Sequence, residues 1–290
     1  MLDIITVVYQ VELPLLEIQA RSIDLYIKPQ DVNQIIIVVN DNDYVADLIN
    51  PEWWGQHATK VIIKTTSEYD LLGTGWENQQ LLKLDAVSTS TQEWAMILDA
   101  KTWFIKELDQ DQLFGNNKKP WSGSVPGRPN VFVQARAFVE KHYNISLPKI
   151  IGPNGVPFLF HTNTVKEMIA EFDNFAEFFT ANVRGPNYVT EFFMYSGYVV
   201  KKYGSLEELY NTNHSYLFPV NIAANETDQF DAIFSQFRRF PKAILTASIH
   251  QHAYPLLSTQ QLDSWAEFLV EKQLFTDTFN AHNMINTYIK

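Results

Sequence analysis

Four short runs of β-branched and other apolar residues lie in the first hundred positions, and they constrain the fold more than any other feature. The runs cover residues 3–9, 34–39, 60–66 and 94–98. The first run does not alternate apolar with polar residues, which is typical of a strand covered on both faces. Residues 11–28 and 73–87 have helical patterns. Because strands that alternate with helices form right-handed crossovers, we predict an α/β fold with a mainly parallel central sheet flanked by helices.

The second half of the chain has a looser pattern. Residues 109–130 concentrate Gly, Pro, Asn and Ser, which predicts a long loop. Helices are expected over residues 132–142, 163–172 and 190–203, strands over 157–161 and 243–250, and a helical tail from Thr259 onward. The sequence shows no internal repeat and no convincing linker. We therefore expect one domain over residues 1–255 and a helical C-terminal extension over 256–290 that packs on it.

The charge balance narrows the choice of partners. The 33 acidic and 22 basic residues give a formal net charge of -11, which disfavours non-specific binding to nucleic acids and to anionic membranes. An anionic ligand therefore needs a local cationic pocket. The chain has no cysteine, which excludes disulfides and thiolate metal sites. Because no apolar run approaches ~18 residues and the start has no basic leader, we expect no transmembrane segment and a cytoplasmic location.

Polar residues follow the predicted strands. In parallel α/β sheets, ligands bind outside the carboxyl ends of the strands. The predicted strand ends are Val8-Tyr9, Asn40-Asp41, Thr65-Thr66-Ser67 and Asp99-Ala100-Lys101. The sequence has no Gly-x-Gly-x-x-Gly, P-loop, Gly-x-Ser-x-Gly or His-Glu-x-x-His motif. The common dinucleotide, nucleoside-triphosphate, serine-hydrolase and zinc-protease sites are therefore not expected.

The same segments resemble a known class of enzymes. A strand that ends in Asn40-Asp41 precedes GWENQQLLKLDAV, which leads into EWAMILDAKTWFI. Over residues 2–255 this order resembles the GT-A class of nucleotide-sugar glycosyltransferases. It is also similar to an uncharacterised glycosyltransferase-like family that has a Gly-Trp-x-x-Gln-Gln-x-x-Lys-Leu helix before a strand ending in Leu-Asp. The resemblance implies a GT-A-like fold that binds a nucleotide-sugar donor and a glycan or other hydroxyl acceptor.

One position departs from the pattern of that class. The fourth strand there usually ends in Asp-x-Asp, whose carboxylates hold a divalent cation; Asp99 matches the first acid, but Lys101 stands at the third position. A lysine removes an oxygen ligand and adds a like charge beside the metal. Our hypothesis is that Lys101 replaces the metal at the diphosphate, and that Asp99 orients Lys101 or contacts the ribose. The alternative is a surface turn in which Lys101 pairs with Asp99 or Glu107. If a metal binds, we expect Mn²⁺ or Mg²⁺ held by Asp99 and His250.

Further cations are candidates for the donor site. Lys83 and Gln79 lie one helical turn apart on the helix that the resemblance places beside the nucleotide, although a solvated helix face has the same composition. Lys118, Lys119 and Arg128 lie in the long loop, which is either a lid over the donor or an ordinary solvated loop.

The resemblance places nucleoside contacts at the first two strand ends, where Tyr9 and Asp41 stand. A carboxylate accepts hydrogen bonds from both ribose hydroxyls, but Asn40-Asp41-Asn42-Asp43 also has the composition of an Asx turn. His250 and His252, two residues apart at a strand end, are expected to point to one face. His250 is therefore a candidate for the diphosphate region, with a purely structural histidine as the alternative.

Glu191 is the candidate catalytic base. We expect Thr190 to cap the helix that Glu191 begins. We also expect aromatic residues around its carboxyl group: Tyr188, Phe192, Phe193 and Tyr195. Desolvation by such rings raises the pKa of a carboxyl group. The resemblance places an acid near the acceptor in many inverting members, so a base at Glu191 implies inversion. The alternative is an acid that only complements the helix dipole.

These residues together predict a glycosyltransferase, of the hexosyltransferase type, that transfers a sugar from a nucleotide-diphosphate sugar to an unknown hydroxyl acceptor. The first alternative is a sugar nucleotidyltransferase, which normally has a glycine-rich phosphate loop after the first strand, where this chain has VVYQVELP. The second alternative is a catalytically inactive GT-A-like protein that binds a sugar or nucleotide. Lys101, in place of a metal-binding acid, keeps this second alternative open.

Overall fold

The computed structural model describes residues 1–69, 75–121, 131–148, 156–185, 187–212, 218–241 and 244–289. The strands are β1 (Leu2–Val8), β2 (Val32–Val39), β3 (Val61–Lys64), β4 (Trp94–Asp99), β5 (Thr102–Phe104), β6 (Phe158–His161), β7 (Phe218–Ile222) and β8 (Ile244–Ile249). The α-helices are α1 (Leu13–Tyr26), α2 (Gly75–Thr89), α3 (Gln110–Leu113), α4 (Val131–Tyr143), α5 (Thr162–Ala170), α6 (Phe175–Val183), α7 (Glu191–Tyr203), α8 (Phe230–Arg239), α9 (Thr259–Glu271) and α10 (Thr278–Asn286). Short 3-10 helices are η1 (Gln10–Glu12), η2 (Pro29–Asp31), η3 (Asp43–Leu48), η4 (Pro51–Lys60), η5 (Thr66–Glu68), η6 (Leu206–Glu208), η7 (Ala224–Gln229) and η8 (Gln251–Leu256).

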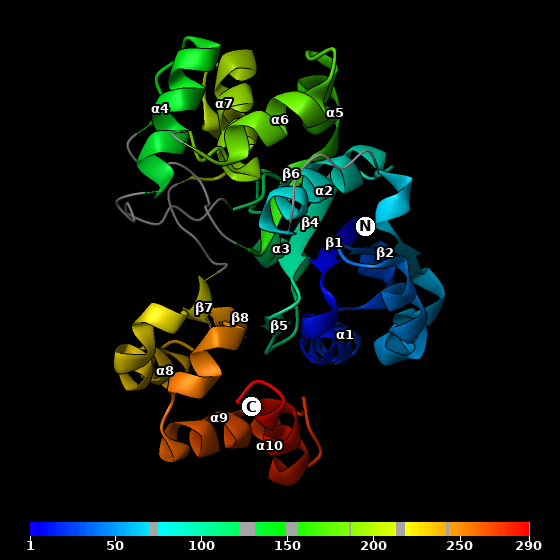
Figure 1. The fold of residues 1–290 in the computed structure, drawn as a ribbon, viewed down its shortest axis with the longest axis vertical. Helices are drawn as coiled ribbons and strands as arrows, with labels where there is room; N and C mark the ends of the chain where they lie inside the picture. Colours follow the sequence, from blue (N-terminus) through cyan, green and yellow to red (C-terminus); the bar gives the residue numbers. More distant parts are fainter. Residues whose placement is uncertain are drawn as a thin grey trace.

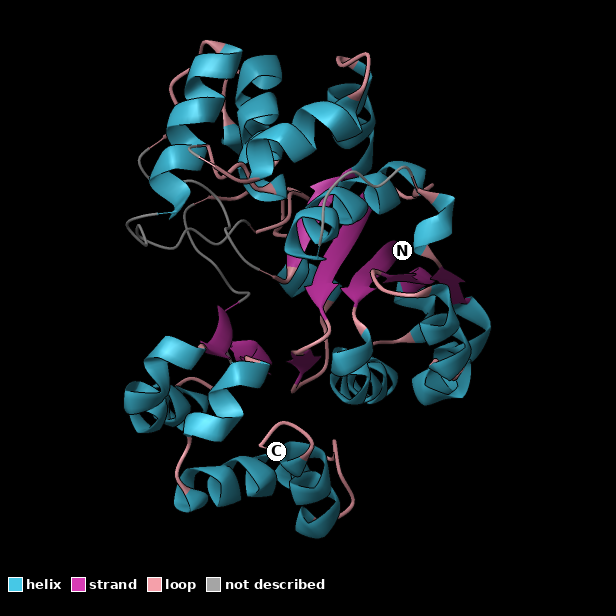
Figure 2. Cartoon of the chain, viewed as in Figure 1, coloured by secondary structure: helices cyan, strands magenta, loops and turns pink. Residues whose placement is uncertain are grey.

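A five-stranded sheet in the order β3-β2-β1-β4-β6 forms the centre of the molecule, with helices packed around it (Figures 1 and 2). The first four strands in this order are mutually parallel, and β6 pairs with β4 in the antiparallel direction. All seven residues of β1 are buried, as expected for a strand in the middle of a covered parallel sheet. The predicted α/β class, with a mainly parallel sheet, is therefore confirmed.

A second sheet of three strands was not predicted. It has the order β5-β8-β7, with β5 antiparallel and β7 parallel to β8. The sequence patterns missed β5 because it has only three residues, and β7 because Pro219 is unfavourable within a strand. Since β5 begins directly after Lys101, its pairing with β8 brings the end of β8 next to the end of β4.

Helices gather at the two ends of the molecule. α4, α5, α6 and α7 lie together at one end and α8, α9 and α10 at the other, with the main sheet between them (Figure 1). α6 and α8 were also missed by the sequence patterns. α7 packs on α4 at Gly197, where an added Cβ would lie 2.1 Å from Cγ1 of Val139. The helix ends at Gly204, whose φ of 83° lies in the left-handed region that glycine adopts readily.

The C-terminal helices make specific contacts with the first half of the chain. Tyr26 donates a hydrogen bond to the carbonyl of Lys272 (2.7 Å), and Tyr288 donates one to the carbonyl of Val11 (3.0 Å). The rings of Trp103 and Trp265 lie 5.9 Å apart. The division into residues 1–255 and 256–290 stays a prediction. Within the described ranges, the helices include none that is both long enough and apolar enough to cross a membrane.

Candidate active site

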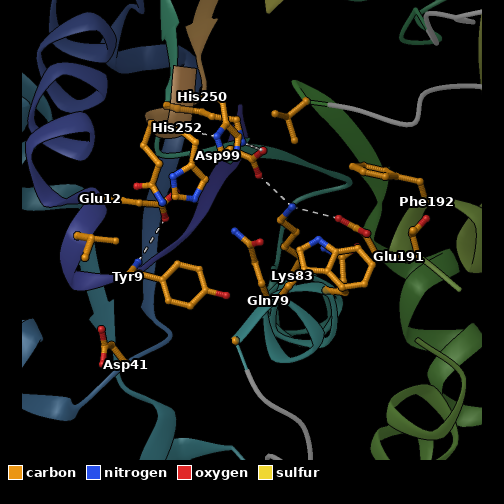
Figure 3. A pocket seen from close by; sticks show the side chains of 18 residues that line it. Tyr9, Glu12, Asp41, Gln79, Lys83, Asp99, Glu191, Phe192, His250 and His252 are labelled. Carbon is orange, nitrogen blue, oxygen red and sulfur yellow. Dashed lines mark hydrogen bonds and ion pairs between the residues drawn. The ribbon is translucent and has the colours of Figure 1, made fainter. Parts of the chain in front are cut away.

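A cavity of about 570 Å³ opens at the carboxyl ends of β1, β2 and β4. Its walls come from α2, from the start of α7 and from η8, which follows β8 (Figure 3). All eight residues predicted for the site line this one cavity: Tyr9, Asp41, Gln79, Lys83, Asp99, Lys101, Glu191 and His250. The structure therefore brings the candidates together, while their individual roles stay predictions.

Four charged side chains form a chain of ion pairs along the floor of the cavity. The ammonium group of Lys101 lies 2.9 Å from Oδ2 of Asp99, and that of Lys83 lies 3.0 Å from Oδ1. Lys83 also lies 3.1 Å from Oε1 of Glu191 (Figure 3). The order is therefore Lys101, Asp99, Lys83 and Glu191, with alternating signs and no net charge.

Burial and the neighbouring charges shift the pKa values of these ion-paired side chains in opposite directions. Burial by itself lowers the pKa of Lys83, but Asp99 and Glu191 outweigh it and hold the pKa well above its usual range. Burial raises the pKa of Asp99, but Lys101 and Lys83 more than offset this and hold it well below its usual range. For Glu191, burial prevails over the attraction of Lys83, so the pKa is raised. Asp99 therefore stays ionised, whereas Glu191 has the stronger affinity for a proton.

The turn that carries Asp99 and Lys101 is fixed from below by Gln19 of α1. Its amide Nε2 donates to the carbonyls of Asp99 (2.7 Å) and Thr102 (3.1 Å), and its Oε1 accepts from the hydroxyl of Thr6 (2.7 Å). Gln19 is fully buried. Because the backbone on both sides of Lys101 is held in this way, the side chain of Lys101 extends from a rigid turn.

The start of α7 places Glu191. Thr190 caps the helix as predicted, because its hydroxyl accepts a hydrogen bond from the backbone N–H of Phe193 (3.4 Å). Glu191 is completely buried, and its Oε2 has no hydrogen-bond partner among the described residues. A buried polar atom without a partner is uncommon. Because Glu191 lines the cavity, its carboxyl group is a candidate partner for a ligand there.

The donor set at Asp99 does not fit a divalent cation. Both oxygens of Asp99 already accept from ammonium groups, and a metal here would lie beside two positive charges. The described part of the chain has no group of three or more His, Cys, Asp or Glu residues that could hold a metal. The expectation that Asp99 and His250 hold Mn²⁺ or Mg²⁺ thus finds no support in their contacts.

The histidines lie beside the ion-pair chain. The prediction that they stand at the end of a strand is wrong by one residue. β8 ends at Ile249, and His250 is the N-cap of η8. His250 Nδ1 accepts from the backbone N–H of His252 (3.2 Å), so the Nε2 of a neutral His250 carries the proton. Burial, with Lys101 and His252 nearby, lowers the pKa of His250 to about 4. His250 is therefore a neutral donor at pH 7.

The expected nucleoside end of the cavity has an ordered polar network. Asn40 Nδ2 donates to the hydroxyl of Tyr9 (2.7 Å) and to the carbonyl of Gly75 (2.9 Å). Asp41 accepts from the backbone N–H groups of Asn42 (2.9 Å) and Gln10 (3.2 Å). These contacts favour the turn interpretation of Asp41, although Asp41 still lines the cavity and keeps acceptor capacity on both oxygens.

The comparisons with known proteins identify the family. A family model described as a family of unknown function, DUF6492, matches residues 4–233. The chain belongs to this family. A search of curated proteins gives no match.

Solved structures of glycosyltransferases are similar to this member of DUF6492. The WbbM bifunctional glycosyltransferase has a TM-score of 0.51 and 14% identity, over 98% of this chain and 51% of that one. GlyE of Streptococcus pneumoniae TIGR4 has a TM-score of 0.48 and 11% identity, over 99% of this chain and 62% of that one. The galactosyltransferase LgtC, solved with donor and acceptor sugar analogues, has a TM-score of 0.45 and 10% identity, over 99% of this chain and 96% of that one. The chain thus spans about half of WbbM and under two thirds of GlyE. The likeness to WbbM shows that this DUF6492 protein has a GT-A-type glycosyltransferase fold.

Two functional candidates in the cavity were missed by the sequence reasoning. Glu12 lies in residues 11–28, whose helical pattern places it away from the apolar face, yet it lines the cavity, where burial and then repulsion from Asp99 raise its pKa to about 6. Gln80 was noted only as part of the helix, yet it also lines the cavity and is 4% exposed. The available signal for Gln80 was its spacing of three residues from Lys83 on one helix.

Other candidates from the sequence lie outside the cavity lining. The ammonium group of Lys119 donates to the carbonyl of Glu207 (2.6 Å), and neither Lys119 nor Lys118 lines the cavity. Arg128 lies outside the described residues. The described part of the long loop therefore brings no cation to the cavity.

Proposed function

We propose that this protein is a glycosyltransferase that transfers a sugar from a nucleotide-diphosphate donor to a hydroxyl acceptor. The observation that carries the proposal is the chain of Lys101, Asp99, Lys83 and Glu191 in a cavity at the strand ends of a GT-A-type fold. It combines cations for a leaving phosphate with a buried carboxyl group for proton transfer. These are the two groups that glycosyl transfer to a hydroxyl requires.

The reaction breaks the bond between the anomeric carbon of the donor sugar and the oxygen of the diphosphate. As this bond breaks, negative charge grows on the diphosphate, and fixed positive groups stabilise it. In our proposal, Lys101 carries out this role in place of a metal, with Lys83 behind Asp99 and the Nε2–H of His250 as further donors. Tyr9, Asp41 and Gln79 hold the nucleoside side of the donor.

The acceptor hydroxyl forms the new bond to the anomeric carbon and loses its proton. We assign the proton to Oε2 of Glu191, because this atom has no hydrogen-bond partner among the described residues and its carboxyl group has a raised pKa. Lys83 at Oε1 holds the carboxyl group in place. A base opposite the leaving group gives direct displacement, so we propose inversion at the anomeric carbon.

The test is a screen of sugar nucleotides for binding and turnover, with and without Mn²⁺ or Mg²⁺ and in excess chelator. We expect turnover that persists in chelator. Lys101→Ala should lower kcat by about 10²-fold or more, as loss of a preorganised charge-stabilising group does. Lys118→Ala, a loop lysine outside the cavity, is the matched control and should leave kcat unchanged.

Three other results of this screen would contradict all or part of the proposal. Complete loss of turnover in chelator would show that a metal, not Lys101, stabilises the diphosphate. Binding without any turnover would favour the inactive sugar- or nucleotide-binding protein. If no sugar nucleotide binds under any condition, the glycosyltransferase proposal is wrong. The cytoplasmic location stays a prediction from the sequence.

A further inference from the structure

One face of α2 lines the cavity from its mouth to its floor. Trp76, Gln79, Gln80 and Lys83 are spaced at i, i+3, i+4 and i+7, which places them on the same side of a helix. Trp76 is 37% exposed, whereas Gln80 is 4% exposed and Lys83 is 3% exposed. The stripe therefore changes from an aromatic ring at the mouth, through amides, to an ammonium group at the floor.

Gln80 is a buried member of the stripe. The residue as a whole is 4% exposed, but its side-chain amide is not among the fully buried polar atoms that lack a partner, and it lines the cavity. Because Gln80 lines the cavity, a ligand in the cavity can supply both a donor and an acceptor to this amide.

The carboxyl group of Glu191 also lines the cavity. Oε2 of Glu191 is buried and has no partner in the described part of the structure. Glu191 comes from α7 and Gln80 from α2, whose Lys83 lies beside Glu191 and pairs with it in Figure 3. The cavity lining thus includes an amide from α2 and a carboxyl group from the neighbouring helix α7.

These groups match the surface of a sugar ring. A pyranose has hydroxyl groups around its edge, which pair with amides and carboxylates, and an apolar C–H face, which packs on an aromatic ring. Phosphate groups would be drawn instead to Lys83 and Lys101. We infer that Trp76, Gln80 and Oε2 of Glu191 form a subsite for the acceptor, and that the acceptor is therefore a saccharide. This inference rests on the proposed function and names the acceptor class for it.

The choice of acceptor over donor sugar follows from Glu191. A hydroxyl bound at its Oε2 is the hydroxyl that loses its proton to this carboxylate. Of the proposed nucleoside contacts, Tyr9 and Asp41 come from a different wall, at the ends of β1 and β2, while Gln79 stands on α2 next to Gln80. An acceptor ring between Trp76 and Glu191 would therefore reach the reacting carbon from the side away from Tyr9 and Asp41, with Gln79 between the two subsites.

The experiment measures binding of simple saccharides by saturation-transfer NMR. The probes are methyl glycosides of glucose, galactose, mannose and N-acetylglucosamine, each tested with and without a nucleoside diphosphate. We expect at least one glycoside to bind, and Trp76→Ala and Gln80→Ala each to weaken it about tenfold. Gln236→Ala, an exposed amide on α8, is the matched control. Because Trp76 is exposed, Trp76→Ala is expected to fold normally. Urea unfolding of Trp76→Ala and Gln80→Ala checks that both variants are folded.

Two results would overturn the inference. If the two variants bind every glycoside as the unchanged protein does, or if no glycoside binds, the subsite is wrong. If the variants instead weaken a sugar nucleotide but not the matching nucleoside diphosphate, the stripe holds the donor sugar and the acceptor assignment fails. Glycoside binding without any binding of sugar nucleotides would leave the saccharide subsite standing and reject the proposed function.

Discussion

Asp99 organises the charges of the cavity at the scale of single residues. It accepts from Lys101 and Lys83, and Lys83 in turn holds Glu191, which stands 92 positions after Asp99. A lysine at position 101 therefore does more than remove a metal ligand. It completes a set of two ammonium groups and two carboxylates in which each buried charge has an opposite partner, as burial requires.

Glu12 is the carboxyl group of the cavity that should titrate near neutrality. Its neighbours are Tyr9, whose backbone N–H reaches Oε2 at 3.4 Å, and the charges of Asp99, Lys101 and Lys83. Burial raises the pKa of Glu12 to about 6, so the folded state favours the protonated form. The contribution of Glu12 to stability is thus present at low pH and is lost as the pH rises through 6.

We therefore expect Glu12→Gln to stabilise the protein by about 2 kcal/mol at pH 8 and by almost nothing below pH ~4.5. Gln keeps an acceptor oxygen for the N–H of Tyr9. The measurement is urea unfolding of both proteins between pH 4.5 and 8. Glu17→Gln, at an exposed carboxylate of α1, should show no such pH dependence. A constant difference between Glu12→Gln and the unchanged protein at every pH would contradict the raised pKa.

The sequence predicted eight residues of the cavity lining, but it did not predict the contacts between them that depend on tertiary structure. Tyr9, Asp41, Asp99 and Lys101 follow from the rule that parallel strands end at one edge of a sheet. The pairing of Lys83 with Glu191 joins positions 108 residues apart. No local pattern encodes this distance, and the same holds for Glu12, whose helix periodicity indicated only a solvated face.

At the scale of elements, α7 depends on its contact with α4. An added Cβ at Gly197 would lie 2.1 Å from Cγ1 of Val139 and 3.0 Å from Cδ2 of Tyr143. Alanine is normally the better helix residue by about 1 kcal/mol, but overpacking of this kind costs about 1–3 kcal/mol. The close approach therefore decides how α7, with Glu191 in its first turn, lies against the rest of the helical end.

We expect Gly197→Ala to destabilise the protein by about 1–2 kcal/mol in urea unfolding, because the packing cost exceeds the gain in helix propensity. Removing the methyl groups of Val139 tests whether the contact with α4 causes this destabilisation. In a double-mutant cycle, Gly197→Ala should cost less in a Val139→Ala background than in the unchanged protein. Additive effects of the two substitutions would show that the contact between α4 and α7 is not the reason.

The elements that the sequence predicted are those with a strong local pattern. β1, β2, β3 and β4 are continuous apolar runs, and α1, α2 and α7 have the expected periodicity or caps. The second sheet was missed because β5 and β7 depend on pairing with β8, and β5 is far from β8 in sequence. β6 was expected as a strand, but its antiparallel direction is decided by pairing with β4 and not by its own residues.

At the scale of the whole molecule, the C-terminal extension and the cavity share a packed core. Trp265 of α9 is completely buried, and its ring lies 5.9 Å from that of Trp103 on β5. The indole N–H of Trp103 donates to the carbonyls of Leu15 (3.1 Å) and Ala100 (3.2 Å). Since Ala100 stands between Asp99 and Lys101, the extension supports the turn that carries both.

We therefore expect Trp265→Ala to destabilise the main unfolding transition by about 3–5 kcal/mol, the usual cost of removing a buried tryptophan. The measurement is thermal and urea unfolding, followed by far-UV circular dichroism for the whole chain. Phe279→Ala on α10 is the matched control, because this ring is 72% exposed and its removal should change stability by about 0.5 kcal/mol or less. A separate early transition for the extension, with the main midpoint unchanged in Trp265→Ala, would instead show that residues 256–290 unfold on their own. The predicted support of the Asp99 turn by the extension would then be wrong.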